Sequence, residues 1–277
     1  MTAVLYESRE GIATLTLSRP ERLNAMRRED YDALIAAIDR AEADRTARVL
    51  ILTGAGRAFC AGTDLSDGFD LPAGGDPATG QDVPPDLGGR VSLRLFRCRK
   101  PVIAAINGAA VGFGASVTLP ADFRLAATGA RFGFVFSRRG IAADGCSSWF
   151  LPRVVGLPCA ADWLLTGRMI EAEEALARGL VSRLVEPGQL MAEARALALD
   201  LVQNTSPLSL AVNRRLLWLA AGQGSPEAAH RLESRAMVAT LAGPDPAEGA
   251  AAFQARRAPV FGTDALDADF LEAWDKP

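Results

Sequence analysis

The stretch Lys100-Pro-Val-Ile-Ala-Ala-Ile-Asn-Gly-Ala-Ala-Val-Gly-Phe-Gly-Ala-Ser116 decides the fold of this chain. Residues 102–106 form a short, wholly apolar run, which predicts a buried strand, and the Asn107-Gly108 pair ends that strand with a turn. The glycines that follow open a short helix, predicted over residues 112–119. A strand, a turn and a helix in this order are typical of an α/β protein.

The remaining pattern extends the same architecture in both directions. Apolar runs and alternation predict strands at residues 4–7, 12–17, 49–53, 123–127 and 181–185. Helical spacing predicts helices at residues 28–44, 91–97, 146–155, 159–165, 171–178, 190–203, 208–221, 226–241 and 246–257. Residues 66–89, rich in glycine, proline and aspartate, are expected to form a mobile surface segment. We therefore expect an α/β core over residues 1–200 and a helical region over residues 201–277.

The composition is that of a globular protein with a large core. The 277 residues are 49% hydrophobic and 23% charged, and 30 basic against 33 acidic residues give a net charge of −3. This balance provides no basic field for a phosphate backbone, so nucleic acid is not expected as a partner. The single histidine, His230, excludes zinc sites that need two or three histidines, and we expect no metal site.

Cysteines and apolar stretches bear on compartment and membrane association. The four cysteines form no CxxC pair and the first ten residues contain no signal-peptide pattern, so a cytoplasmic protein is expected. Residues 101–121 carry no charge over a length that can span a bilayer. Glycine, asparagine, serine, threonine and proline interrupt them, so we expect a buried strand, turn and helix and no membrane partner.

Two glycine-containing turns are candidates for ligand binding. The first is Gly108-Ala-Ala-Val-Gly-Phe-Gly114, but Val117 stands where a dinucleotide fingerprint needs its third glycine. Amides in the first turn of the following helix lack intrahelical acceptors and can face an anion or a developing oxyanion. The alternative is a turn in which glycine serves close packing. The second turn, Phe59-Cys-Ala-Gly-Thr-Asp-Leu65, also lets a ligand approach the backbone closely.

Taken together, these segments resemble the crotonase, or enoyl-CoA hydratase/isomerase, superfamily. The motifs that carry the resemblance are Arg19-Pro-Glu-Arg-Leu-Asn-Ala-Met26, Gly56-Arg-Ala-Phe-Cys-Ala-Gly-Thr-Asp-Leu65, Lys100-Pro-Val-Ile-Ala-Ala-Ile-Asn-Gly108, Ser148-Trp-Phe-Leu-Pro-Arg-Val-Val-Gly156, Glu171-Ala-Glu-Glu-Ala-Leu-Ala-Arg-Gly-Leu-Val181 and the tail of residues 249–261. They follow one another in order through nearly the whole chain. The resemblance implies a ββα spiral core with C-terminal helices that assemble homotrimers or dimers of trimers.

The resemblance also implies an acyl-CoA thioester as substrate, with no cofactor beyond its CoA moiety. By motif position, the amides of Thr63 and Phe113 would hold the thioester oxygen and stabilise its enolate. Losing one such donor typically costs roughly a hundredfold in rate. The positions matched to CoA binding are Leu23, Ala25, Ala61, Asp64, Gly112 and Phe261, the last often acting from a neighbouring subunit. For Asp64, a role in the local turn is an equal alternative.

Departures from the family pattern bear on the reaction. Hydratases of this family use two glutamates to activate water, and this chain has Ser116 and Phe136 at those positions, where they would line the substrate pocket. Neither side chain can act as a carboxylate base. A carboxylate stands at Asp144, where isomerases of the family carry the acid that moves a proton between carbons. We therefore expect a Δ3,Δ2-enoyl-CoA isomerase-type proton transfer with Asp144 as the base.

Asp144 also has a simpler interpretation as the N-cap of the helix that follows it. A capping carboxylate accepts backbone N–H bonds, which lower its pKa. A base for the α-carbon of a thioester instead needs a raised pKa. The two interpretations therefore predict opposite directions for the pKa of Asp144.

Other functions remain as alternatives. Within the family these are an enoyl-CoA hydratase, another acyl-CoA lyase, and a carboxylate nucleophile as in aromatic acyl-CoA dehalogenases, whose supporting histidine and tryptophan have no assigned counterpart here. From another class, the chain would be a non-catalytic acyl-CoA-binding protein. An RNA-binding role, known for an outlying member of the superfamily, ranks last because the chain has no basic stretch.

Overall fold

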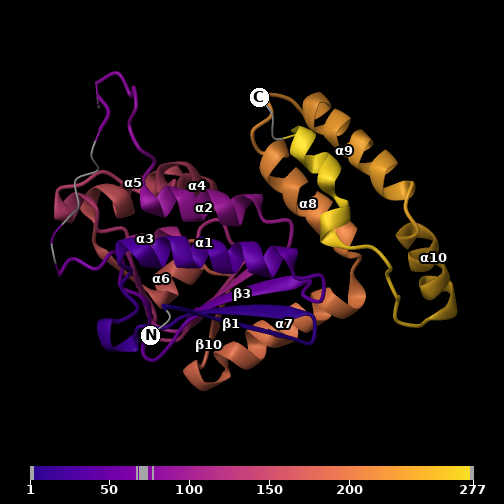
Figure 1. Cartoon of the computed structure of the whole chain (residues 1–277), viewed down its shortest axis with the longest axis horizontal. Helices are drawn as coiled ribbons and strands as arrows, with labels where there is room; N and C mark the ends of the chain where they lie inside the picture. The colour runs from indigo at the N-terminus through magenta and orange to yellow at the C-terminus, as the bar shows by residue number, and fades with distance from the viewer. Residues whose placement is uncertain (1–2, 67, 69–73, 77, 275–277) are drawn as a thin grey trace.

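The computed structural model describes residues 3–66, 68, 74–76 and 78–274, whose arrangement is shown in Figure 1. The strands lie in a body at the left of this view, and helices α8, α9 and α10 lie together at its right. The predicted α/β class is confirmed by this mixture of sheets and helices. The division of the chain at residue 200 stays a prediction.

The larger sheet forms the centre of the body. Among the described residues its strand order is β1-β2-β3-β5-β7-β10, with β1 antiparallel to β2 and the other neighbours parallel. Its strands are β1 (Val4–Arg9), β2 (Ile12–Leu17), β3 (Val49–Gly54), β5 (Val102–Ile106), β7 (Phe123–Ala127) and β10 (Arg183–Val185). Each contains or lies within a run that the sequence predicts as a strand.

Alternation along the strands buries both faces of this sheet. Val49 of β3 packs in the apolar layer beneath α7 (Leu190–Asn204). Its neighbour Leu50 points the opposite way, into the main core that α1 (Arg28–Ala43) covers. Successive strand residues face opposite sides of a sheet, so a strand apolar at every position fits a sheet with helices on both sides.

The structure contains a second, smaller sheet that the sequence does not predict. Within the described part of the chain its order is β4-β6-β8-β9, with the first two pairings parallel and the last antiparallel. The strands are β4 (Ala58–Cys60), β6 (Ala109–Val111), β8 (Arg131–Gly133) and β9 (Met169–Glu171). Strands of three residues are too short to show a hydrophobic period. Since β3, β5 and β7 are each followed by one of these strands, the chain winds as a spiral of paired strands.

The helices cover the sheets and build the C-terminal region. Besides α1 and α7, they are α2 (Leu87–Arg97), α3 (Phe113–Ser116), α4 (Ser147–Val155), α5 (Leu157–Thr166), α6 (Ala172–Ala177), α8 (Pro207–Ala220), α9 (Pro226–Leu241) and α10 (Asp245–Ala255). Short 3-10 turns are η1 (Pro20–Arg22), η2 (Ser137–Arg139), η3 (Pro187–Gln189), η4 (Ala265–Asp267) and η5 (Asp269–Trp274).

Two helix predictions differ from the structure by more than two residues at one end. Helix α2 begins at Leu87, four residues before the predicted start, because the Asp86 side chain caps it by accepting the Gly89 amide. Helix α3 ends at Ser116, and turns replace the rest of the helix predicted over residues 112–119. Within the segment predicted to be mobile, residues 67, 69–73 and 77 lie outside the described residues, so that expectation stays untested.

Two buried cations tie the elements together. The ammonium of Lys100 donates to the carbonyl oxygens of Ala41 and Asp44 at 2.8 and 2.6 Å, at the C-terminal end of α1. A cation at this end complements the helix dipole. Arg214 of α8 makes a 2.7 Å ion pair with Asp122 and donates to four backbone carbonyls of the α2 and β7 regions. Arg214 therefore docks α8 onto the body.

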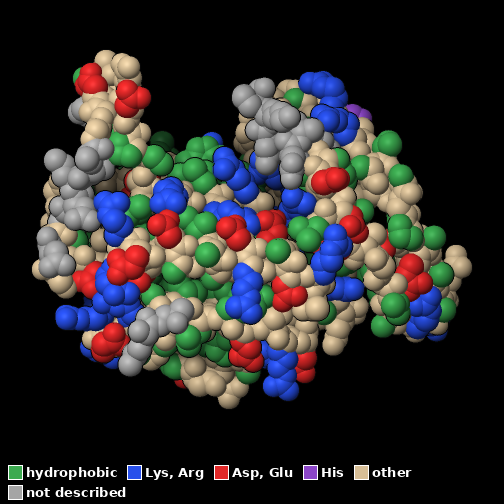
Figure 2. Space-filling view, in the orientation of Figure 1, with side chains coloured by type: hydrophobic (Ala, Val, Ile, Leu, Met, Phe, Trp, Pro, Cys, Tyr) green, Lys and Arg blue, Asp and Glu red, His purple; other side chains and the backbone are tan. Residues whose placement is uncertain are grey.

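The uncharged stretch of residues 101–121 lies inside the body as β5, β6 and α3. No helix among the described residues combines the length and apolar character needed to cross a bilayer. Figure 2 shows Lys and Arg side chains interspersed with Asp and Glu over the face in view. This mixture matches the near balance of charge in the sequence.

Candidate active site

The ends of two parallel strands bring Gly62 and Gly112 together. Strands β4 and β6 pair with Cys60 opposite Ala110, and both chains continue into glycine turns. A Cβ placed on Gly62 would lie 2.8 Å from the carbonyl oxygen of Val111, and one on Gly112 would lie 3.9 Å from the Cα of Gly62. Both glycines have positive φ values, 100° and 55°. At position 62, glycine therefore allows both the close approach of the Val111 carbonyl and the positive φ value.

Thr63 and Phe113 directly follow these glycines. Met26 holds the Thr63 segment, because its amide donates to the Gly62 carbonyl and its carbonyl accepts the Asp64 amide, each at 2.8 Å. Phe113 is the first residue of α3, where a backbone amide has no intrahelical acceptor. Among the hydrogen bonds of the described residues, neither the Thr63 nor the Phe113 amide donates to a backbone acceptor. Each of the two adjoining turns is thus followed by a backbone amide that has no backbone acceptor among the described residues.

Tyr31 of α1 contacts both of these residues. Its hydroxyl lies 2.8 Å from Thr63 Oγ1, and its ring centroid lies 4.7 Å from that of Phe113. Burial raises the pKa of Tyr31 above its ordinary value, so the phenol is neutral. The sequence presents Tyr31 only as an apolar position of an amphipathic helix. Its link to Thr63 and Phe113 becomes visible only when the strand ends are placed in space.

Asp144 lies beside the same turns, in the loop before α4. The Ser116 hydroxyl donates to Asp144 Oδ1 at 3.2 Å. A Cβ placed on Gly88 would lie 2.9 Å from Asp144 Oδ2 and 3.1 Å from Phe113 Cδ2. The carboxyl and the Phe113 ring therefore border the same small space at the start of α2. The structure brings three predicted site residues, Phe113, Ser116 and Asp144, together there.

The interpretation of Asp144 as a helix cap is wrong. Helix α4 begins at Ser147, its N-cap is Cys146, and that end of the helix has no side-chain cap. Asp144 contributes its main-chain oxygen, which accepts the Ser147 amide at 3.0 Å. Loss of hydration raises the pKa of its carboxyl to about 6, helped by the charge of Asp86 and opposed by the Ser116 hydroxyl. The direction is the one expected of a base.

Phe136 belongs to the main hydrophobic core and is 4% exposed. Its carbonyl accepts the amides of Arg139 at 2.8 Å and Ile141 at 3.2 Å, which shapes the loop that leads to Asp144. Cys60 lies at the end of β4, and burial raises the pKa of its thiol to about 12. At neutral pH this cysteine is protonated and is a poor nucleophile.

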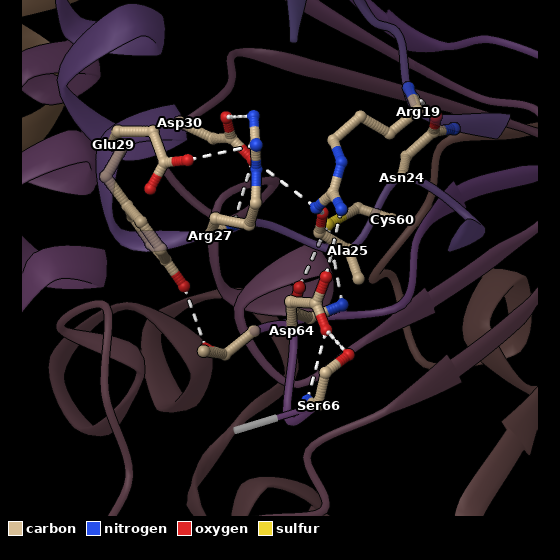
Figure 3. Close-up of polar contacts among 12 residues, drawn as sticks. Arg19, Asn24, Ala25, Arg27, Glu29, Asp30, Cys60, Asp64 and Ser66 are labelled. Carbon is tan, nitrogen blue, oxygen red and sulfur yellow. Dashed lines mark hydrogen bonds and ion pairs between the residues drawn. The ribbon is translucent and has the colours of Figure 1, made fainter. Parts of the chain in front are cut away.

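The segments matched to CoA binding lie side by side. Leu23 has a left-handed backbone, and its carbonyl accepts the Ala61 amide at 2.9 Å. The Arg19 guanidinium donates to the Ala25 carbonyl at 2.6 Å and to Asp64 at 3.0 Å (Figure 3). Leu23, Ala25 and Ala61 thus share one neighbourhood. Their contacts with CoA stay a prediction.

Asp64 has a role in its local turn, which is the alternative to CoA binding at this position. Its carboxylate accepts the Ser66 hydroxyl at 2.6 Å and the Ser66 amide at 3.2 Å, as Figure 3 shows. Together with Arg19, these bonds lower its pKa to about 2. Phe261 follows α10, where a Cβ placed on Gly249 would lie 3.8 Å from its ring. Its contact with CoA in a neighbouring subunit stays a prediction.

The paired sheets, the adjoining glycine turns and the buried carboxyl define an α/β spiral protein with a candidate active site at the strand ends. The family model described as enoyl-CoA hydratase/isomerase matches residues 7–264. This chain belongs to the enoyl-CoA hydratase/isomerase family.

Relatives in this family are named as hydratases and as isomerases. The chain is 37% identical to enoyl-CoA hydratase ACTT3 of Alternaria alternata, over 91% of this chain and 83% of that protein. It is also 37% identical to the 1,2-epoxyphenylacetyl-CoA isomerase of Escherichia coli (strain K12), over 94% of this chain and 98% of the relative. The crystal structure of a probable enoyl-CoA hydratase/isomerase from Mycobacterium abscessus superposes with a TM-score of 0.86 at 35% identity, covering 95% of this chain and 100% of that one.

Proposed function

We propose that this protein is an acyl-CoA isomerase that moves a double bond between the Δ3 and Δ2 positions of an enoyl-CoA. The observation that carries the proposal is the Asp144 carboxyl, whose pKa is raised to about 6 beside Phe113 and Ser116. A general base works best with a pKa near the pH at which it operates. Asp144 meets that requirement, and its neighbour Phe113 carries one of the two backbone amides that we assign to the thioester oxygen.

In the proposed reaction, the Thr63 and Phe113 amides donate to the thioester carbonyl oxygen. Asp144 as carboxylate removes a proton from C2, and the electron pair of the C–H bond delocalises through the thioester and the Δ3 double bond. The protonated Asp144 then returns the same proton to C4, which leaves the double bond between C2 and C3. Atoms and electrons balance without a redox partner, because the thioester itself acidifies the proton at C2.

The main alternative is an enoyl-CoA hydratase, which several relatives' names favour. Against it stand Ser116 and Phe136, which occupy the positions matched to the two hydratase glutamates and carry no carboxylate. The name of the Escherichia coli relative adds a second kind of isomerisation, of an epoxide next to an acyl-CoA. An isomerase name among the relatives supports the isomerase side of the proposal.

The proposal is tested by following two reactions of the purified protein separately. With a 3-enoyl-CoA we expect conversion to the conjugated 2-enoyl-CoA, and with a 2-enoyl-CoA we expect little hydration. Asp144→Asn should lower isomerisation by roughly a hundredfold or more while acyl-CoA binding persists. Fast hydration without isomerisation would contradict the proposal. Acyl-CoA binding with no exchange of the C2 proton for solvent deuterium would favour the non-catalytic alternative.

A further inference from the structure

Asp86 joins the start of α2 to the loop that carries Asp144. Its Oδ1 accepts the Gly89 amide at 2.5 Å, which caps α2, and the Gly145 amide at 3.2 Å. Gly145 directly follows Asp144 in the chain. One carboxylate oxygen therefore links two segments that are 59 residues apart.

Three glycines make this approach possible. A Cβ on Gly88 would lie 2.9 Å from Asp144 Oδ2, and a Cβ on Gly89 would clash with Asp86 Oδ2. A Cβ on Gly145, whose φ is +63°, would lie 2.6 Å from the Cβ of Ser116. Gly88 therefore leaves room for the Asp144 carboxyl at the start of α2, and Gly89 leaves room for the Asp86 carboxyl. Gly145 leaves room for Ser116.

The groups that face Asp144 come from several elements. Tyr31 of α1 and Cys60 of β4 interact with it electrostatically, and both have raised pKa values that keep them neutral. Cys146 in its own loop also has a raised pKa and is uncharged at neutral pH. Asp86 is thus the charged group, among the described residues, whose field acts on Asp144. A like charge at short range disfavours ionisation of a carboxyl.

We propose that Asp86 is the positioning residue of the site: it holds the Asp144–Gly145 turn against the start of α2 and places a second negative charge beside the Asp144 carboxyl. The consequence for catalysis rests on the proposed function, in which Asp144 must accept a proton at C2 and return it at C4. A carboxyl poised near neutral pH performs both steps, whereas a strongly acidic one would return the proton readily but remove it poorly.

The deciding comparison uses Asp86→Asn and Asp86→Ala. Asparagine keeps a carbonyl oxygen for the Gly145 and Gly89 amides and removes the charge, while alanine removes both. Titration of 13C-labelled aspartate carboxyls by NMR, with the Asp144 signal assigned through Asp144→Asn, measures the coupling without any enzyme assay. In Asp86→Asn we expect the Asp144 midpoint to move from about 6 towards 3.8. An unchanged midpoint would overturn the role of the charge.

The positioning role is tested by turnover. Asp86→Asn should lower kcat about tenfold because Asp144 becomes a weaker base. Asp86→Ala should lower it by roughly a hundredfold because the loop loses its anchor. Equal rates for the two variants would overturn the anchoring role. If alanine prevents folding, Asp86→Ser keeps a shorter cap oxygen that cannot reach both amides and takes its place in the comparison.

Ser225→Ala is the matched control, since it removes the N-cap of α9 and leaves the site intact. It should lower the thermal midpoint without moving the Asp144 titration. The two measurements distinguish failure of the Asp86 proposal from failure of the proposed function. If Asp144→Asn isomerises at the wild-type rate, the proposed function fails, yet the NMR titration still decides whether Asp86 sets the ionisation of Asp144.

Discussion

The hydroxyl of Ser116 donates a 3.2 Å hydrogen bond to Oδ1 of Asp144 and also lies 3.2 Å from the Gly112 carbonyl oxygen. This bond stabilises the carboxylate form and lowers the pKa that burial and Asp86 raise. Serine therefore occupies the position matched to a hydratase glutamate with a different effect. It tunes a carboxyl on another segment instead of supplying one.

Ser116→Ala should therefore raise the pKa of Asp144 above about 6. Since the carboxylate is the form that removes a proton, the acidic limb of kcat/KM should move to higher pH, and the loss of rate should be largest below pH 7. The pH profile of isomerisation measures this shift. Ser92→Ala is the control, because the Ser92 hydroxyl is also buried, has no hydrogen-bond partner among the described residues and lies next to Gly145. An equal shift of the pH profile in Ser92→Ala would contradict the role of the Ser116 hydroxyl in setting the pKa of Asp144.

Asp144→Asn should stabilise the fold although it lowers the rate of isomerisation. The folded-state pKa of about 6 lies above the unfolded value of 3.8, so the stability linked to protonated Asp144 is present below pH 3.8 and lost as the pH rises through 6. Removing the charge should therefore raise the free energy of unfolding by about 1–3 kcal/mol at pH 8. Thermal unfolding at pH 8 and pH 4 checks this. A difference that grows towards low pH would contradict it.

Tyr31→Phe isolates the contact between α1 and the Thr63 turn. The phenylalanine ring keeps the packing against Phe113 and loses the 2.8 Å hydrogen bond to Thr63 Oγ1. We expect a loss of about 1 kcal/mol in stability and a several-fold fall in kcat with little change in KM. Thr63→Val removes the same bond from the other side. The two changes together should cost no more than one alone, and additive losses would show that the bond does not couple them.

The sequence predicts the central sheet well and the second sheet poorly. Residues 49–53 and 102–106 are continuous apolar runs, and both are strands of the larger sheet. Strands β4 and β6 have three residues each, and their apolar character merges with the turns that follow. These short strands create the site, because their parallel pairing places Gly62 beside Gly112.

The sequence predicts those residues of the candidate site that stand in recognisable motifs. Asp144 stands at a motif position, and its pKa direction agrees with the expectation for a base. Tyr31 is missed because helical periodicity explains it fully. Asp86 is missed because it lies in a segment rich in glycine, proline and aspartate, and the helix is expected to begin later. The signal that could have found it is an aspartate placed directly before Leu87, the first residue of α2.

Arg214→Ala should strongly destabilise the protein. The Arg214 side chain is 5% exposed, pairs with Asp122 at 2.7 Å and donates to four backbone carbonyls. Its loss therefore leaves the Asp122 carboxylate without its cation and removes a donor from each carbonyl. Breaking a buried ion pair in this way costs about 3–5 kcal/mol. Urea unfolding measures the change. Arg231→Ala on the exposed side of α9 should stay within about 0.5 kcal/mol, and a similar loss there would contradict the docking role of Arg214.

The C-terminal helices expose apolar side chains that the expected assembly would cover. Leu217 of α8 is 74% exposed and Met237 of α9 is 56% exposed, and both line a cavity of about 610 Å³ between the two helices. If this region forms trimer contacts, Leu217→Asp should reduce the mass measured by light scattering towards that of one chain, because burying a charge at an interface is costly. Leu165→Asp on α5 is the matched control, since Leu165 is also 74% exposed but lies outside residues 201–277. A wild-type protein that already scatters as a single chain, or equal dissociation by both variants, would contradict assembly through the C-terminal helices.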